Sequence, residues 1–437
     1  MPDFARSTDP RVQAQLDRLD KLSPAGDRLG LDRIAELLDR LGRPQDRLPP
    51  VFHVAGTNGK GSTCAFLRSA IEASGRSVHM FTSPHLVRFN ERIRIAGKLI
   101  EDDHLSALLT EVLDVSAGIE PSFFEVATAV ALLAFSRASA DACILEVGLG
   151  GRLDATNVVE RPAVCGIASL ALDHQQFLGN RLGDIAAEKA AIAKAGVPLV
   201  TQLYPTQVAA RVWETAREKG ATWLPRGGKW DARVQRGSLR YSDERGTLDL
   251  PLPSLLGKHQ ALNAALAVAM LRHQQAVEVP DAAALREGMR SADWPARMQR
   301  LSAGPLTHLL PAGSELWLDG GHNPSAARTI AEFVQLRFRD DLPLVLVFAS
   351  LGTKDPKGTL APFRGLADQV LTVPIAGHDH RGPDDLAALA RSLGFRAEAY
   401  RHAAEALSAI QVPARVLIFG SLYLAGEVLA ANDEVPD

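Results

Sequence analysis

Residues 53–63, HVAGTNGKGST, place three glycines around one lysine where an apolar run passes into a helical pattern. The run 51–55 predicts a short strand, and the apolar spacing after residue 63 predicts a helix. The glycines let backbone N–H groups approach an anion, the helix N-terminus adds partial positive charge, and the lysine supplies a full charge. These residue types in this order predict a phosphate-binding loop formed by Gly56, Thr57, Asn58, Gly59, Lys60, Gly61 and Ser62.

The loop departs from the usual spacing G-x-x-x-x-G-K-[ST]. Val54 stands where the first glycine is expected, and Gly61 separates Lys60 from Ser62. A glycine turn with an exposed lysine is the alternative interpretation. It is less favoured, because a strand, glycines, a lysine and hydroxyl groups seldom follow one another in this order.

Polar side chains follow three further strand-like runs. Glu146 ends the run 142–147 and precedes the glycine-rich segment GLGGRLDATN, Ser83 lies in the segment TSPH, and His174 follows Asp173. Ligands of open α/β sheets collect at the carboxyl ends of the strands, and Mg²⁺ prefers oxygen ligands beside substrate phosphates. Glu146 is therefore a candidate Mg²⁺ ligand, although a helix cap or an ion pair with Arg152 would also account for it.

Two other motifs carry reactive residue types. Lys189 lies in EKAAIAK, a helical pattern in which most lysines are solvated, so its residue type alone does not make it catalytic. The motif DGGHNP runs from Asp319 through His322 and Asn323, and it follows a strand-like run. Asn323 is expected to cap a helix whose first turn contains Pro324, so part of this motif is accounted for by a helix start.

Composition limits the classes of function. The 437 residues are 46% hydrophobic and 23% charged, with a net charge of -3, which argues against a general nucleic-acid binder. The three cysteines lie far apart in apolar sequence, which favours buried free thiols in a reducing compartment, so a cytoplasmic location is expected. No apolar run is long enough to span a bilayer, and no membrane partner is expected.

The chain length predicts two domains. Strand-like and helical runs alternate, which predicts an α/β fold. We expect a mostly parallel-sheet P-loop ATPase domain in residues 1–296, with a small antiparallel edge sheet near residues 223–253, followed by a smaller Rossmann-like α/β domain in residues 297–437. The remaining expected strands are 77–82, 142–147, 163–169, 198–203, 316–318, 344–348, 369–373 and 415–419.

Taken in order, these motifs resemble folylpolyglutamate synthase and the bifunctional dihydrofolate synthase/folylpolyglutamate synthase of the Mur-ligase superfamily. The resemblance covers nearly the whole chain. It depends on the segments GTNGKGST, TSPHLVRFNERI, SFFE, EVGLGGRLDATN, LDH, EKAAI, WPARMQR, DGGHNP and GSLYLAGEV, which occur in this order.

The resemblance implies an ATP-dependent ligase that phosphorylates a carboxylate of its substrate and then joins the amine of L-glutamate to it. The implied substrates are dihydropteroate, reduced folates or both, together with ATP and L-glutamate. The implied cofactor is Mg²⁺, as two ions. We expect a bifunctional enzyme that acts as a monomer. A monofunctional folylpolyglutamate synthase and a non-catalytic ATP-binding homologue are the alternatives.

The same resemblance implies roles for individual residues. Lys60, His174 and Lys189 would be catalytic, with Lys189 carbamylated, and the nucleotide would contact the phosphate loop together with Asn263, Arg297 and Asp319. Ser83, Glu146 and His174 would hold Mg²⁺, and His322 and Asn323 are further site residues from the motif DGGHNP, which begins with Asp319. The pterin would contact Leu29, Gly30, Leu31, Ser122, Phe123, Phe124, Glu125, Leu153, Asp154 and Ala155.

Three positions depart from the family pattern: Ala191 replaces a frequent glycine, Gly321 a usual alanine, and Thr353 a common acidic residue. None of them is a proposed ligand. A peptidoglycan-building Mur ligase would carry a UDP-binding domain ahead of the phosphate loop, whereas 55 residues precede Gly56 here. The folate branch of the superfamily is therefore expected.

Overall fold

The computed structural model describes residues 6–22, 29–338 and 342–437. Contacts divide the chain into two compact units, the first made of Met1–Ser254 and His259–Asp293, the second of Leu255–Lys258 and Trp294–Asp437. The short segment Leu255–Lys258 thus groups with the second unit, although the sequence prediction placed it in the first domain. The predicted boundary between an ATP-binding domain and a Rossmann-like domain, between residues 296 and 297, stays a prediction.

The first unit is built on an eight-stranded sheet. Its strands are β1 Val51–Ala55, β2 Val78–Phe81, β3 Ile93–Ile95, β4 Lys98–Leu99, β5 Ala142–Glu146, β6 Val164–Ile167, β7 Pro198–Thr201 and β8 Thr222–Pro225. They lie in the order β4-β3-β2-β5-β1-β6-β7-β8, and only the pairings of β3 with β2 and with β4 are antiparallel. The carboxyl ends of β2, β5, β1 and β6 therefore lie side by side at one edge of the sheet.

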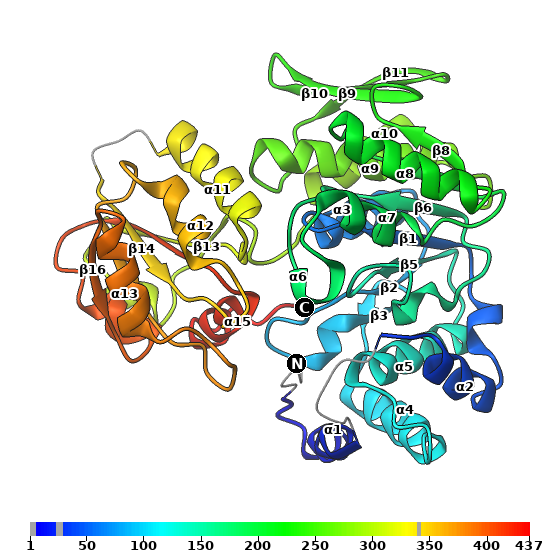
Figure 1. Cartoon of the computed structure of the whole chain (residues 1–437), viewed down its shortest axis with the longest axis horizontal. Coiled ribbons are helices and arrows are strands. Elements are labelled where there is room, and N and C mark those ends of the chain that lie inside the picture. The colour runs from blue at the N-terminus through cyan, green and yellow to red at the C-terminus, as the bar shows by residue number, and fades with distance from the viewer. Residues whose placement is uncertain (1–5, 23–28, 339–341) are drawn as a thin grey trace. The chain divides into compact units, whose positions relative to one another are not determined.

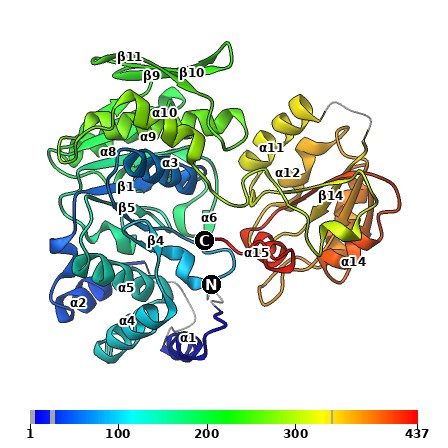
Figure 2. The same cartoon turned by 180° about the vertical axis from the view of Figure 1, so that it is seen from behind.

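Helices cover both faces of this sheet. They are α1 Pro10–Leu22, α2 Asp32–Arg40, α3 Lys60–Ala73, α4 Asp102–Val115, α5 Phe123–Arg137, α6 Gln175–Leu178, α7 Leu182–Ala190, α8 Thr206–Glu218, α9 Lys258–His273 and α10 Ala282–Ser291. Figures 1 and 2 show α3, α9 and α10 on one side of the sheet and α2, α4 and α5 on the other. The central strands β1, β5 and β6 are consequently buried along their whole length and mostly apolar, as in other parallel sheets.

The region near residues 223–253 forms a separate antiparallel sheet. Its strands β9 Trp230–Gln235, β10 Ser238–Asp243 and β11 Gly246–Pro251 lie in the order β11-β10-β9. The expected antiparallel strands are confirmed, but they form a sheet of their own, and the first part of the region, β8, pairs in parallel with β7. Asp243 accepts hydrogen bonds from Arg272 Nε and Nη2 at 2.6 and 2.7 Å, which ties β10 to the end of α9.

The second unit contains a six-stranded sheet. Its elements are β12 Gln299–Arg300, β13 Glu315–Leu318, β14 Leu344–Phe348, β15 Gln369–Thr372, β16 Arg396–Ala399, β17 Arg415–Phe419, α11 Pro324–Arg337, α12 Pro356–Leu360, α13 Pro383–Ser392, α14 Ala403–Ser408 and α15 Leu422–Ala431. The strand order is β12-β13-β17-β14-β15-β16, with β12 alone antiparallel to its neighbour. The expected doubly wound pattern is confirmed, while β12 and β16 were not expected.

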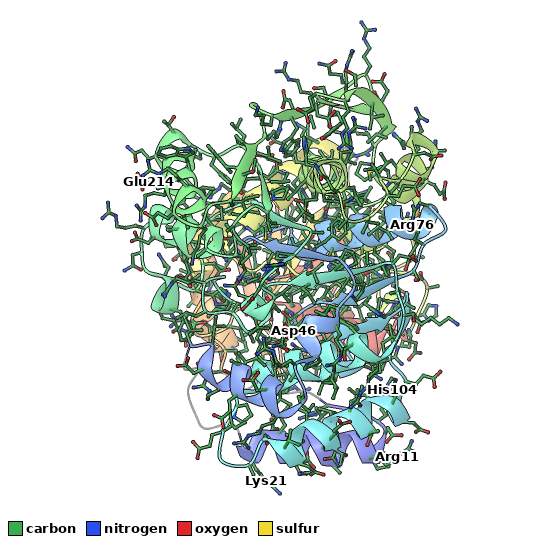
Figure 3. The ribbon with its side chains drawn as sticks, turned by 90° about the vertical axis from the view of Figure 1, so that its right-hand side faces the viewer. Arg11, Lys21, Asp46, Arg76, His104 and Glu214 are labelled. Carbon is green, nitrogen blue, oxygen red and sulfur yellow. The ribbon has the colours of Figure 1, made fainter. Side chains whose placement is uncertain are left out.

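The three cysteines lie in the interior of the first unit. Cys64, Cys143 and Cys165 are buried free thiols, which confirms that prediction. In the part of the chain that the structure describes, no helix has the length and apolarity needed to cross a membrane. Figure 3 shows the charged side chains of Arg11 and Lys21, both on α1, at the periphery of the first unit.

Candidate active site

The candidate site of the first unit lies where β2, β5, β1 and β6 end. Parallel pairing aligns Val54 of β1 with Glu146 of β5 on one side and with Gly166 of β6 on the other. The phosphate loop follows β1 and leads into α3 (Figure 1). Residues far apart in the sequence are therefore brought to one sheet edge, as expected from the strand-end positions.

The loop backbone requires glycine at two positions. Gly56 and Gly59 have φ values of 152° and 88°, which side chains rarely allow. A Cβ at Gly56 would lie 2.9 Å from Ala168 Cβ, and a Cβ at Gly59 would collide with the side-chain amide of Asn263. Asn263, on α9, thus lies directly against the loop.

The start of α3 follows this turn. The first helical hydrogen bond runs from Thr63 N to Gly59 O at 2.9 Å, so the N–H groups of residues 60–62 precede it. Such N-terminal N–H groups have no acceptor within their own helix, and they carry the positive end of the helix dipole. This geometry fits an anion at the loop.

Thr57 fastens the loop to the segment that follows β6. Its backbone N–H donates to Ser169 O at 2.7 Å. Its hydroxyl donates to Ala171 O at 3.0 Å and accepts from Ala171 N at 3.1 Å. The backbone N–H and the hydroxyl of Thr57 therefore both bond to residues 169–171, which precede Asp173 and His174 in the sequence.

Lys60 and Glu146 form the charged centre of this edge. Lys60 Nζ lies 4.0 Å from Glu146 Oε1, and Glu146 Oε2 accepts a hydrogen bond from Ser83 N at 3.3 Å. The carboxylate is buried. Ser62 Oγ, in the first turn of α3, is buried and has no hydrogen-bond partner among the described residues.

These oxygen donors fit Mg²⁺. Over the described residues, no group of three or more His, Cys, Asp and Glu side chains could by itself hold a metal ion. Mg²⁺ does not need such a group, because it usually keeps several waters and binds through one or two carboxylates together with substrate phosphates. A buried carboxylate and an unsatisfied buried hydroxyl beside a phosphate loop suit that mode of binding.

Lys189 is buried in α7 and has an unusual environment. Its Nζ lies 3.4 Å from Gly150 O. Burial, together with the nearby charge of Lys60, lowers the pKa of Lys189 to about 7, although Asp173, Asp154 and Glu188 oppose the shift. The sequence alone favoured a solvated lysine; the structure instead buries the amine, and a pKa of about 7 leaves about half of it neutral at pH 7.

His174 and Asp173 lie at the start of α6. His174 is exposed and adopts φ 49°, and its backbone N–H donates to Asp173 Oδ1 at 2.8 Å. Asp173 is buried and acts electrostatically on Lys189. The sequence prediction selected His174 and not Asp173, which lies in the loop between β6 and α6; its place beside His174 was the only local signal for it.

The glycine-rich segment after β5 is held by Asp154. This buried carboxylate accepts from Leu149 N at 2.8 Å and from Thr156 N and Oγ1 at 3.0 and 2.5 Å. Burial raises its pKa. Thr156 Oγ1 also lies 2.8 Å from His53 Nε2, so β1 and the glycine-rich segment share one buried polar chain. Leu153 and Ala155 flank the carboxylate in sequence.

The SFFE segment starts α5. Ser122 and Glu125 form a capping box, in which Ser122 N donates to Glu125 Oε2 at 2.6 Å. Arg33 Nε donates to the same oxygen at 3.1 Å. No motif selects Arg33, whose one local signal is that it lies at the start of α2, shortly after Leu29, Gly30 and Leu31.

The two phenylalanines of this segment differ in environment. Phe123 is buried against the Phe89 ring, with Arg92 Cζ 5.3 Å from its centroid. Phe124 is half-buried, and its ring lies 5.9 Å from that of Phe81 and against the Cα of Gly148. Phe123 is therefore a core residue, whereas Phe124 borders the glycine-rich segment.

The remaining candidate site residues, among them Asp319 and Asn323, lie in the second unit. Asp319 follows β13, is buried, and accepts from Met298 N at 2.8 Å and Gly321 N at 2.7 Å. Burial raises its pKa, and Arg297 and His322 oppose this shift. Asn323 Oδ1 accepts from Ala326 N at 2.9 Å at the start of α11, which confirms the predicted helix cap.

Comparison with known proteins agrees with these motifs. No protein-family model matches the sequence. The dihydrofolate synthase/folylpolyglutamate synthase of Escherichia coli K12 is 35% identical over 410 residues, which cover 93% of this chain and 92% of that protein. The chain belongs to the dihydrofolate synthase/folylpolyglutamate synthase family.

Solved structures of the family have the same fold. The structure of E. coli FolC in complex with DHPP and ADP matches with a TM-score of 0.85 and 34% identity, over 98% of each chain. A bifunctional folylpolyglutamate synthase/dihydrofolate synthase with Mn, AMPPNP and L-glutamate bound matches with a TM-score of 0.83 and 32% identity, over 97% of this chain and 98% of that one. The expected α/β fold is confirmed.

Proposed function

We propose that this chain is an ATP-dependent ligase that joins L-glutamate to dihydropteroate, to the glutamyl carboxylate of reduced folates, or to both. The reaction passes through an acyl phosphate and releases ADP and phosphate. The observation that carries the proposal is the meeting of Lys60, Glu146 and Ser83 at one sheet edge in a chain of this family. The pairing of both synthase names in its relatives favours bifunctionality.

Charge is the main problem that such a site must solve. An anionic carboxylate brought to about 4 Å from a phosphate charge is repelled by about 4 kcal/mol at an effective dielectric of about 20. In the proposed site, Lys60 and the N–H groups at the start of α3 offset part of this charge. Mg²⁺, for which we propose two ions held by Ser83, Glu146 and His174, supplies further positive charge to the phosphate oxygens when bound.

The buried Lys189 suits carbamylation. A neutral amine attacks CO₂, the new N–C bond forms, and the nitrogen loses a proton, which leaves an anionic carbamate. Because the pKa of Lys189 is lowered to about 7, the neutral form is available near neutral pH. We assign the carbamate the role of orienting the incoming amine of glutamate.

The other candidates receive roles in the same reaction. The phosphate loop and Asn263 in residues 1–296, and Arg297 and Asp319 in the Rossmann-like residues 297–437, would contact ATP, with His322 and Asn323 supporting the latter pair. Phe124 is the ring we assign to stacking on the pterin, since Phe123 is buried in the core. The remaining proposed pterin contacts are Leu29, Gly30, Leu31, Ser122, Glu125, Leu153, Asp154 and Ala155.

We place the enzyme in the cytoplasm as a monomer. Buried free cysteines are typical of proteins from reducing compartments. Sedimentation of the purified protein checks the monomer.

The test is a side-by-side assay with dihydropteroate and with tetrahydrofolate. ADP release is expected only when ATP, Mg²⁺, L-glutamate and an accepted folate substrate are all present. Lys60→Ala should abolish turnover while circular dichroism shows an intact fold. No glutamate-dependent ADP release with either substrate would refute the ligase and favour a non-catalytic ATP-binding homologue.

A further inference from the structure

The turn that carries Arg297 has an unusual backbone. Ala296 and Met298, the two neighbours of Arg297, have φ values of 55° and 44°. Non-glycine residues seldom adopt this left-handed region of φ. Two such residues on either side of one position persist only where the surrounding structure holds them. Both residues are fully buried.

Hydrogen bonds to the start of the DGGHNP motif hold one side of this turn. Gly320 N donates to Ala296 O at 2.9 Å, and Met298 N donates to Asp319 Oδ2 at 2.8 Å. Arg297 Nη1 also donates to Ala296 O, at 2.8 Å. The guanidinium of Arg297 and the carboxylate of Asp319 are therefore positioned by the same turn.

Gln299 holds the other side. Its Oε1 accepts from Ala296 N at 2.9 Å, and its Nε2 donates to Glu434 Oε2 at 3.0 Å. Glu434 is in turn fixed, because its Oε1 accepts from Ser302 N and from Asn432 Nδ2, each at 2.7 Å. A continuous hydrogen-bonded path thus runs from the segment after α15 to the strained turn.

We propose that Gln299, braced by Glu434, is a positioning residue that holds the Arg297 turn in the geometry that binds ATP. This inference rests on the proposed function, in which Arg297 and Asp319 contact the nucleotide. Gln299 itself acts only through the backbone of Ala296. Without it, the strained turn relaxes and the guanidinium leaves its place beside Gly320.

Exchanging the two partner groups provides a specific test. Gln299→Glu sets two carboxylates against each other at the 3.0 Å contact, and like charges at this distance repel. In the double variant Gln299→Glu/Glu434→Gln, the donor and the acceptor merely change places. The carboxylate at 299 can accept from Ala296 N, and the amide at 434 can donate to it while still accepting from Ser302 N.

The experiment measures ATP affinity by calorimetry, KM for ATP, kcat and the melting temperature, in the full-length chain. Gln299→Glu should weaken ATP binding and raise KM for ATP about tenfold, equivalent to about 1.4 kcal/mol, while kcat at saturating ATP changes little. The double variant should restore both values. Gln411→Glu, an exposed position in the same unit, makes the same charge change and should leave them unaltered.

The outcomes separate this inference from the proposed function. If the wild-type protein binds ATP but shows no glutamate-dependent turnover, the proposed ligase activity is contradicted. The role of Gln299 is then tested by the ATP affinities of the variants alone. Unchanged ATP affinity in Gln299→Glu overturns the positioning role alone. A double variant that folds but binds ATP no better than Gln299→Glu also overturns the positioning role. The double variant therefore tests the role even if the Gln299→Glu variant is poorly stable.

Discussion

Replacing Lys189 with methionine should change how the stability of the first unit depends on pH. Burial, with a smaller effect of Lys60, lowers the pKa of Lys189 from 10.5 to about 7 in the folded chain. Below pH 7 both the folded and the unfolded chain hold the proton. Between pH 7 and 10.5 the unfolded chain binds more protons than the folded chain, so the free energy of unfolding rises with pH in this window.

The size of the effect follows from the shift. Each pH unit in the window contributes about 1.36 kcal/mol. Between pH 6 and pH 8.5 the wild-type protein traverses about one and a half units above its folded pKa, so it should gain about 2 kcal/mol of stability relative to Lys189→Met. Lys229→Met, at an exposed position, should show no such difference.

Urea unfolding in CO₂-free buffer at the two pH values measures this difference, since CO₂ would convert the neutral amine to a carbamate. A direct measurement accompanies it: the ¹³Cε signal that disappears in Lys189→Met should titrate near pH 7 in the wild-type protein. A signal that titrates near 10.5, or an equal stability difference at both pH values, would show that the buried amine is charged and refute the reasoning.

Two further predictions concern the phosphate loop. Thr57→Val removes both hydrogen bonds to Ala171 and should lower the stability by about 2 kcal/mol and reduce turnover. Thr57→Ser should retain both hydrogen bonds. Thermal melts and ADP release measure the two effects, and equal behaviour of the two variants would contradict the prediction. Gly59→Ala combines left-handed backbone with a collision against Asn263, and should lower ATP affinity in calorimetry at least about tenfold. Gly75→Ala has similar backbone strain in open space, so an equal loss of affinity there would refute the collision.

Local patterns predicted much of the fold. The mostly apolar runs at 51–55, 344–348 and 415–419 are strands with those bounds, because parallel strands buried on both faces are rich in apolar residues. The strand β16, with the sequence RAEA, escaped prediction because it is short and partly exposed. The two-residue β12 is defined only by its pairing with β13, which no local pattern encodes.

The candidate site divides in the same way. The positions of Lys60 at a helix start and of Glu146 at a strand end followed from the sequence, but the 4.0 Å between Lys60 Nζ and Glu146 Oε1 depends on β5 lying beside β1. Phe123 and Phe124 have the same residue type and adjacent positions, yet α5 buries one and leaves the other beside Gly148. Local sequence does not distinguish two such environments.

By itself, the sequence predicted the phosphate loop, since glycines, a lysine and a helix start act through the backbone of consecutive residues. It also determined the family, through motifs in a fixed order. Tertiary structure alone decided that Lys189 is buried with its pKa lowered to about 7, and that Gln299 joins Glu434 to the Arg297 turn. Desolvation and hydrogen bonding between distant segments depend on which elements pack together, and only the folded chain sets those distances.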